Sequence, residues 1–432
     1  MLLVLALPQA VEAREVRAGV GRVEITPTQP IWLSGYAART KPSEGVAHKL
    51  YAKALALEDG GRGKVVIVTT DLIGLPRSVT EPVAAAVGKQ YGLERSRLMF
   101  NSSHTHAGPV VTPNLMTMYF LSDEQRGAVN VYRDQLVVHL TNVIGAALGN
   151  MAPAKITVGH GKVGFSHNRR TPGGPIDQDV PVIAVRDSGN KLKVVLFGYA
   201  CHNTTLGGDY YQVSGDYAGY AQTEMEKLQP GVTAMFLLLC GGDQNPNPRG
   251  TVAHAEQYGK ALAAEVNRVA GGAKPLAVKL QTAFQVTELT FAAHTREQFE
   301  QESKDENKFK ASRAREMLRA YDERRPLRRT PYPVQAIRLG KGVTLLALGG
   351  EVVVDYALRT KKEFAGTDVI VAGYSNDVMC YIPSLRVLRE GGYEGETSMI
   401  YYGQPGKFAE DVEETVFRSV YQVMNQVGVK KK

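Results

Sequence analysis

The chain has 432 residues, of which 44% are hydrophobic and 22% charged, and no low-complexity tract interrupts it. This composition is typical of a globular protein with a large buried core and excludes a disordered or fibrous chain. The formal net charge is +8, but basic residues concentrate at 313–329 and 430–432, without a nucleic-acid-binding motif. We therefore exclude nucleic acid as a partner and interpret these segments as solvated surface, with peripheral membrane contact as an alternative.

The N-terminus carries a short apolar run at residues 1–8, and small residues flank Glu12 where a signal peptidase would read them. This pattern predicts a truncated signal peptide over residues 1–13 and a secreted or periplasmic protein, with an apolar tail as the alternative. Residues 14–432 contain no repeat or flexible linker and are expected to form a single domain. The three cysteines, all in or beside apolar runs, are expected to be buried free thiols.

Hydrophobic periodicity predicts alternating strands and helices along the chain. A helix ending at Tyr91 has a candidate capping box in Ser78 and Glu81, and a helix over 122–150 begins with Ser122 and Gln125. Further helices are expected over 251–270, 296–325 and 406–426. Strands are expected at 20–27, 50–57, 64–75, 98–100, 180–185, 192–199, 234–240, 276–291 (or a hairpin), 343–348 and 368–373. This alternation predicts an α/β (α+β) fold, with a mixed multi-stranded sheet core and flanking helices.

Two histidines, His104 and His106, follow directly after the strand that ends at Phe100. On an extended chain, side chains two residues apart point to the same face, which would place the two imidazoles side by side. Such a pair suits metal binding, or metal binding by one ring and proton transfer or oxyanion stabilisation by the other. A hydrogen-bonded turn without a metal is the alternative interpretation.

Other strands also deliver polar residues at their C-terminal ends, the edge where ligand sites of α/β sheets lie. His202 follows the strand at 192–199, and Glu351 follows Gly350 after the strand at 343–348. Two histidines and one glutamate are a frequent catalytic zinc set that leaves one position open for water. Spacing alone does not decide whether these residues converge.

In chain order, these segments resemble the neutral, non-lysosomal ceramidase family. That family carries a His-Thr-His-Ser-Gly-Pro motif, an Asn-Arg-Ser-Pro loop, a histidine followed by Thr-Ser, an Asp-x-x-Gly-x-Ala helix start, a Gly-Glu pair, and two tyrosines twelve residues apart. The similar segments here are 104–109, 168–172, 202–205, 215–221, 350–351, and Tyr381 with Tyr393. Each match is short, but together they keep the family order from about residue 20 to 400.

The resemblance implies a zinc ion held by His104, His202, Glu351 and Tyr381. It also implies that the reacting carbonyl is lined by His106, Tyr393 and an arginine, for which we favour Arg169 because it directly follows Asn168. The reaction would be hydrolysis of an N-acyl amide by a metal-activated water, with these groups stabilising the oxyanion or protonating the leaving amine.

The sequence departs from the family in two ways. Asn245 stands where the family has a serine beside the substrate, and asparagine cannot serve as a nucleophile there. We also expect the C-terminal sandwich domain of the family to be lacking, because the chain ends soon after Tyr393. We therefore expect a zinc-dependent, ceramidase-like amide hydrolase whose small-molecule substrate, an N-acyl compound or glycoconjugate, is not ceramide. The alternatives are an ester- or glycoside-cleaving enzyme with the same site and a non-catalytic ligand-binding protein.

Overall fold

Two β-sheets stack face to face in the computed structural model, which describes residues 15–60 and 63–432, so the expected signal peptide lies outside the described residues. The larger sheet has the order β11-β9-β8-β6-β1-β3-β4-β5, with β13 also paired to β6, and the smaller has the order β14-β15-β16-β18. The larger sheet is mixed, since β4/β5 and β9/β11 are parallel and its other pairs antiparallel. The predicted mixed α/β fold is therefore confirmed.

The strands of the two sheets have the following bounds: β1 Val16–Glu24, β3 Tyr51–Asp59, β4 Lys64–Thr70, β5 Leu98–Ser102, β6 Ala152–Lys162, β8 Asp179–Asp187, β9 Leu192–Tyr199, β11 Thr233–Leu238, β13 Lys274–Pro275, β14 Val278–Thr290, β15 Arg329–Gly340, β16 Val343–Leu348 and β18 Asp368–Ala372. Short pairs join β2 (Gly45–Val46) to β10 (Gln212–Val213), β7 (Ser166–Asn168) to β12 (Gln244–Pro246), and β17 (Glu351–Val352) to β19 (Tyr381–Ile382). The helices are α1 Arg77–Tyr91, α2 Asp123–Gly149, α3 Asp216–Leu228, α4 Val252–Gly272, α5 Arg296–Glu302, α6 Lys308–Asp322, α7 Val354–Glu363, α8 Leu385–Glu390, α9 Met399–Tyr402 and α10 Val412–Gln426.

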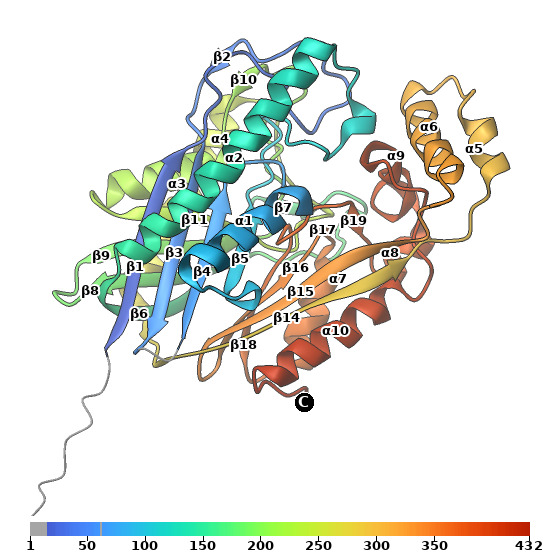
Figure 1. Cartoon of the computed structure of the whole chain (residues 1–432). Coiled ribbons are helices and arrows are strands. Elements are labelled where there is room, and N and C mark those ends of the chain that lie inside the picture. Colours follow the sequence, from blue (N-terminus) through green and yellow to red (C-terminus); the bar gives the residue numbers. More distant parts are fainter. Residues whose placement is uncertain (1–14, 61–62) are drawn as a thin grey trace, which may run out of the picture.

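Alternating side chains divide the strands between an inner core and an outer core. In β4, Val65 and Ile67 enter the core between the sheets, whereas Val66 and Val68 face helices α1 and α2. The same alternation turns β8, β9 and β11 toward α3 and α4, and β16 toward α7 and α10. The molecule is therefore layered helix, sheet, sheet, helix, with α2 across the larger sheet and α10 beneath the smaller one (Figure 1).

The side-chain amide of Asn101, near the end of β5, ties three strand ends together. It accepts a hydrogen bond from the Leu238 N–H (2.8 Å) and donates to the carbonyl oxygens of Leu238 (3.1 Å) and Gly373 (2.8 Å). Because β5 and β11 stand at opposite ends of the strand order, this amide joins the two edges of the larger sheet. The segments after β5, β11 and β18 consequently leave the sheets at one place.

The N-termini of α1 and α2 test the two capping boxes predicted from the sequence. Ser122 and Gln125 form the predicted capping box of α2. The capping box predicted at Ser78 and Glu81 is wrong: α1 begins at Arg77 without a side-chain cap from its own segment. The Arg77 N–H instead donates to the Asp377 carboxylate (3.0 Å), so a residue 300 positions away satisfies the helix end.

The structure corrects several helix and surface expectations and confirms the one for the cysteines. The last helix begins at Val412 rather than at 406, and residues 296–325 form two helices, α5 and α6. Arg313 of α6 is buried, and it donates to the carbonyl of Pro405 (2.7 Å), so this part of the basic segment is not solvated surface. The three cysteines, Cys201, Cys240 and Cys380, are buried free thiols as predicted. No helix in the described part of the chain is long and apolar enough to cross a bilayer.

His160 of β6 links the two sheets, and its loss is expected to destabilise the fold in a pH-dependent way. Hydrogen bonds to Asp179 (2.9 Å) and Asp368 (2.7 Å) raise the pKa of His160 from 6.5 to about 10. Because the pKa is raised on folding, the contribution is complete below pH 6.5 and is lost as the pH rises through 10. Urea unfolding of the H160Q variant should show a loss of about 1 kcal/mol at pH 6, since the ring is partly exposed, and almost none above pH 10. An equal loss at both pH values would contradict this role, and H139Q, on the surface of α2, is the matched control.

Candidate active site

Four of the predicted site residues converge beyond the strand ends. His104 follows β5, His202 follows β9, and Glu351 follows β16. Glu351 Oε2 lies 3.0 Å from Nε2 of both histidines, and the Tyr381 hydroxyl lies 3.1 Å from His202 Nε2. All four side chains are almost fully buried. The tertiary fold therefore brings together residues spread over nearly 280 positions.

His104 and His106 also meet, but the extended chain predicted for them is wrong. The strand β5 ends at Ser102, and His104 has a left-handed backbone with φ of 62°. The His104 N–H donates to the Leu72 carbonyl (2.8 Å), which fixes this turn from a neighbouring segment. The two Nε2 atoms lie 3.1 Å apart, so the pair arises from a turn rather than from strand alternation.

Backbone carbonyls set the protonation of the two buried histidines. Nδ1 of His104 contacts the Ile73 carbonyl, and Nδ1 of His202 contacts the Gly241 carbonyl at 2.7 Å. A carbonyl only accepts hydrogen bonds, so each Nδ1 carries the proton and each neutral ring directs its Nε2 lone pair inward. Two nitrogen lone pairs and a carboxylate oxygen thus face one another, an arrangement that needs a cation between them. The donor set fits a metal ion.

The position of Glu351 follows from its neighbours. Strands β17 and β19 pair in parallel, which sets Glu351 beside Tyr381. Gly350 has φ of 73°, and a Cβ there would approach the Cys380 carbonyl to 2.7 Å, so the approach requires glycine. The hydroxyls of Tyr374 (3.3 Å) and Tyr402 donate to the two carboxylate oxygens.

His106 occupies the border between the buried cluster and the surface. Its ring packs against Tyr36, with centroids 4.8 Å apart, and its buried Nδ1 has no hydrogen-bond partner among the described residues. Gly35 has φ of 91°, and a Cβ there would lie 2.3 Å from that Nδ1. The ring therefore fits only against glycine. A possible metal-binding group is formed by His104, His106 and His202. One ring nitrogen of each lies within 4.8 Å of the other two.

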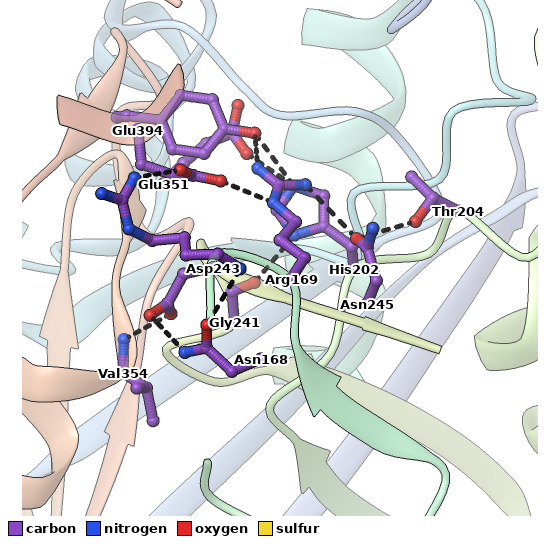
Figure 2. Close-up of polar contacts among 12 residues, drawn as sticks. Asn168, Arg169, His202, Thr204, Gly241, Asp243, Asn245, Glu351, Val354 and Glu394 are labelled. Atoms are coloured by element: carbon purple, nitrogen blue, oxygen red, sulfur yellow. Dashed lines mark hydrogen bonds and ion pairs between the residues drawn. The ribbon is translucent and has the colours of Figure 1, made fainter. Parts of the chain in front are cut away.

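Arg169 reaches three parts of the site. Its guanidinium donates to Glu394 (2.6 Å), to the Tyr381 hydroxyl (3.0 Å) and to Asn245 Oδ1 (3.3 Å). Figure 2 shows Arg169 lying between Glu394 and Asn245. A guanidinium has five N–H groups, so at least two remain for a ligand.

The neighbouring Arg170 does not take the same position. It pairs with the other oxygen of Glu394 and with Glu390 (3.2 Å), and it donates to the Gly391 carbonyl (2.9 Å). Of the two arginines between which the sequence left a choice, Arg169 is thus the one in contact with Tyr381.

Buried polar groups hold the arginine loop in place. Asp243 accepts hydrogen bonds from the Val354 N–H (2.9 Å) and from the Asn168 amide (3.1 Å), as Figure 2 shows. Asn168 in turn accepts from the Arg170 N–H (2.9 Å). Burial raises the pKa of Asp243 to about 6, partly offset by the Val354 N–H. These contacts determine the direction in which Arg169 leaves the loop.

A cleft of about 750 Å³ opens above the cluster. His106, Arg169, Tyr381 and Asn245 lie on its walls, together with Tyr393, whose side chain is 40% exposed. Asn245 Oδ1 also accepts a hydrogen bond from Thr204 (3.3 Å). The eight residues singled out from the sequence therefore all lie in the buried cluster or on the cleft that opens onto it.

Four residues of the site were missed by the sequence reasoning: Tyr374, Asp243, Glu394 and Tyr402. Glu394 follows directly after Tyr393, and Asp243 stands two positions before Asn245, so their positions beside residues already singled out held a usable signal. Tyr402 ends the short helix α9, outside the matched motifs, and only the fold brings its hydroxyl to Glu351.

The fold and this cluster define a mixed α/β protein with a buried histidine–glutamate centre suited to a metal ion. The chain belongs to the neutral/alkaline non-lysosomal ceramidase family, because the family's N-terminal region matches residues 16–276. Neutral ceramidases of Drosophila melanogaster and Drosophila pseudoobscura are 26% identical over an alignment of 262 residues, and the match covers 54% of this chain. The resemblance noted in the sequence is therefore confirmed.

The chain matches only 36% of the length of those curated relatives. The crystal structure of neutral ceramidase from Pseudomonas aeruginosa is similar over 97% of this chain and 75% of its own, with a TM-score of 0.78 and 19% identity. A ceramidase complexed with C2 is similar with a TM-score of 0.76 and 18% identity. At these identities the structures establish a shared fold, which covers 97% of this chain and therefore extends past residue 276.

Removing Glu394 is expected to destabilise the protein strongly. Glu394 is 2% exposed and pairs with both Arg169 and Arg170, so E394A leaves Arg169 without its buried counter-charge and Arg170 with only the half-exposed Glu390. The free energy of unfolding, measured with urea, should fall by about 3 kcal/mol. The control is E390A, which removes a half-exposed partner of Arg170 and should cost less than about 1 kcal/mol. Equal losses in the two variants would show that Glu394 does not neutralise the pair.

Proposed function

We propose that the protein is a zinc-dependent hydrolase that cleaves a linear N-acyl amide. The observation that carries the proposal is the convergence of three acceptors, Nε2 of His104, Nε2 of His202 and Oε2 of Glu351, with both Nδ1 protons directed to backbone carbonyls. Membership of the ceramidase family supports the same reaction class.

The proposed ligands are His104, His202, Glu351 and Tyr381. Two imidazoles, a carboxylate and a phenol suit zinc better than magnesium or calcium, which prefer all-oxygen sites. A zinc ion held there would polarise the substrate carbonyl and lower the pKa of a water molecule.

The residues on the cleft wall then act on the substrate. As the carbonyl carbon is attacked, negative charge develops on the carbonyl oxygen, and Arg169 and the hydroxyl of Tyr393 donate hydrogen bonds to it. His106 lines the same cleft, where it would take up a proton from the attacking water and pass it to the leaving amine. Asn245 holds the Arg169 guanidinium through its Oδ1 and takes no covalent part.

Ceramide does not suit the cleft. Among the described residues that line it, none is valine, leucine, isoleucine, methionine or phenylalanine. Two long hydrocarbon chains would therefore remain largely in water. Binding would lose about 25 cal/mol of favourable free energy for each Å² of apolar surface that stays exposed. We propose a polar substrate instead.

The polar lining also favours a second candidate, cleavage of an ester or a glycoside by the same residues. A substrate panel separates the two, because an amidase releases a free amine and a glycosidase a reducing sugar. A non-catalytic binding protein of this fold would release neither.

We further propose that the protein is secreted and that residues 14–432 form a single catalytic domain. The apolar run at residues 1–8 supports export. The inter-sheet core, to which strands from β3 to β18 contribute, supports a single domain.

Metal content provides the first test. Purified protein should contain about one zinc per chain, and H202A should lose it, because the substitution removes one of the four proposed ligands. H139A, which alters a helix-surface histidine, should retain the metal. The measurement is elemental analysis of both variants after exhaustive dialysis. Metal retained in H202A would contradict the proposed centre.

Chelation provides the second test. Incubation with a strong chelator should abolish amide hydrolysis, and stoichiometric zinc should restore it, since the lone pairs and Glu351 carboxylate need a cation. Thermal unfolding should shift to lower temperature in the chelated protein, because bound metal stabilises the folded state. Full activity without metal would overturn the zinc mechanism.

A further inference from the structure

The walls of the cleft carry charge and aromatic surface rather than aliphatic surface. Three arginines, two glutamates and three tyrosines lie among the fifteen residues that line it. A volume of about 750 Å³ suits one drug-sized molecule, so a ligand would meet several of these groups at once.

The three arginines of the cleft differ in their partners. Arg169 and Arg170 share the buried carboxylate of Glu394, and Arg170 also pairs with Glu390. Arg249 is exposed and has no ion-pair or hydrogen-bond partner for its side chain among the described residues. It is therefore the cation of the cleft whose charge the protein leaves uncompensated.

The surroundings of Arg249 add to this positive potential. The residue stands three positions before α4, a helix of 21 residues whose N-terminus carries partial positive charge. Its charge is also felt at Tyr36: burial and Asp216 raise the pKa of the Tyr36 hydroxyl, and Arg249 offsets part of that rise. Tyr36 packs on His106, so Arg249 lies on the same side of the cleft as the reacting groups.

We propose that the substrate is a polar N-acyl compound that bears a carboxylate, such as an N-acylated amino acid, and that Arg249 binds this carboxylate. This inference rests on the proposed amidase function and identifies its substrate class. Arg249 pairs with the carboxylate, the flat faces of Tyr36 and Tyr393 flank the body of the molecule, and the amide reaches His106 and Arg169. The residue acts on binding and specificity and takes no part in the bond-breaking step.

The test compares a matched pair of substrates, N-acetyl-phenylalanine and N-acetyl-phenylalaninamide, which differ only in the carboxylate. Wild-type protein, loaded with zinc, should prefer the carboxylate. In R249A the KM for N-acetyl-phenylalanine should rise about 10-fold, the lower range for a charged hydrogen bond at an exposed site, with kcat little changed. The KM for the carboxamide should not change.

Two further variants separate charge from structure. R249K keeps the charge but not the fork geometry and should recover part of the affinity. R315A removes an exposed arginine of α6, away from the cleft, and should leave both KM values unchanged. Because Arg249 makes no internal hydrogen bond in the described chain, R249A is expected to fold normally.

The outcomes separate the substrate class from the function itself. If R249A changes both KM values equally, or if the wild type prefers the carboxamide, the assignment of Arg249 is overturned while the amidase function stands. If neither compound is hydrolysed, the amidase function fails, and calorimetric binding of N-acetyl-phenylalanine decides the inference separately. Binding that weakens about 10-fold in R249A supports a carboxylate site, and binding unaffected by the substitution overturns it.

Discussion

The side-chain amide of Asn101 is the constraint on which the rest of the site depends. It pairs with both backbone groups of Leu238 and with the Gly373 carbonyl, so the edges of the larger sheet and the smaller sheet are held at one point. Each of these contacts is buried, where an unsatisfied partner would carry the full desolvation cost. The segments that bear His104 and Asp243 leave the sheets within a few residues of this point.

Two buried carboxylates organise the charges around that point. Glu351 faces two imidazole lone pairs and needs a cation, whereas Glu394 is neutralised by two guanidinium groups. Arg169 connects the two centres, because it pairs with Glu394 and donates to Tyr381 beside His202. The histidine–glutamate cluster and the cleft wall are thus joined by the hydrogen bonds of Arg169.

The cleft of this scaffold carries no valine, leucine, isoleucine, methionine or phenylalanine among the described residues that line it. The fold is shared with neutral ceramidases, but fold alone does not determine the substrate, which depends on the residues that line the site. Here the lining is polar and aromatic, and Asn245 stands beside Arg169. The fold and the side chains that line the cleft are therefore separable features of this protein.

Much of this organisation was readable in the sequence, and the reasons are local. Nearly continuous apolar runs rich in β-branched residues and leucine indicated buried strands such as β4 and β16, and the capping box at Ser122 indicated the start of α2. The ordered motifs identified the family and the eight residues of the site. What only the tertiary structure decided depends on long-range contacts: the cap of α1 by Asp377, the left-handed turn at His104, and the hydroxyl of Tyr402 on Glu351. No local pattern encodes these contacts, because each is made by a residue that packing, rather than chain neighbourhood, brings within reach.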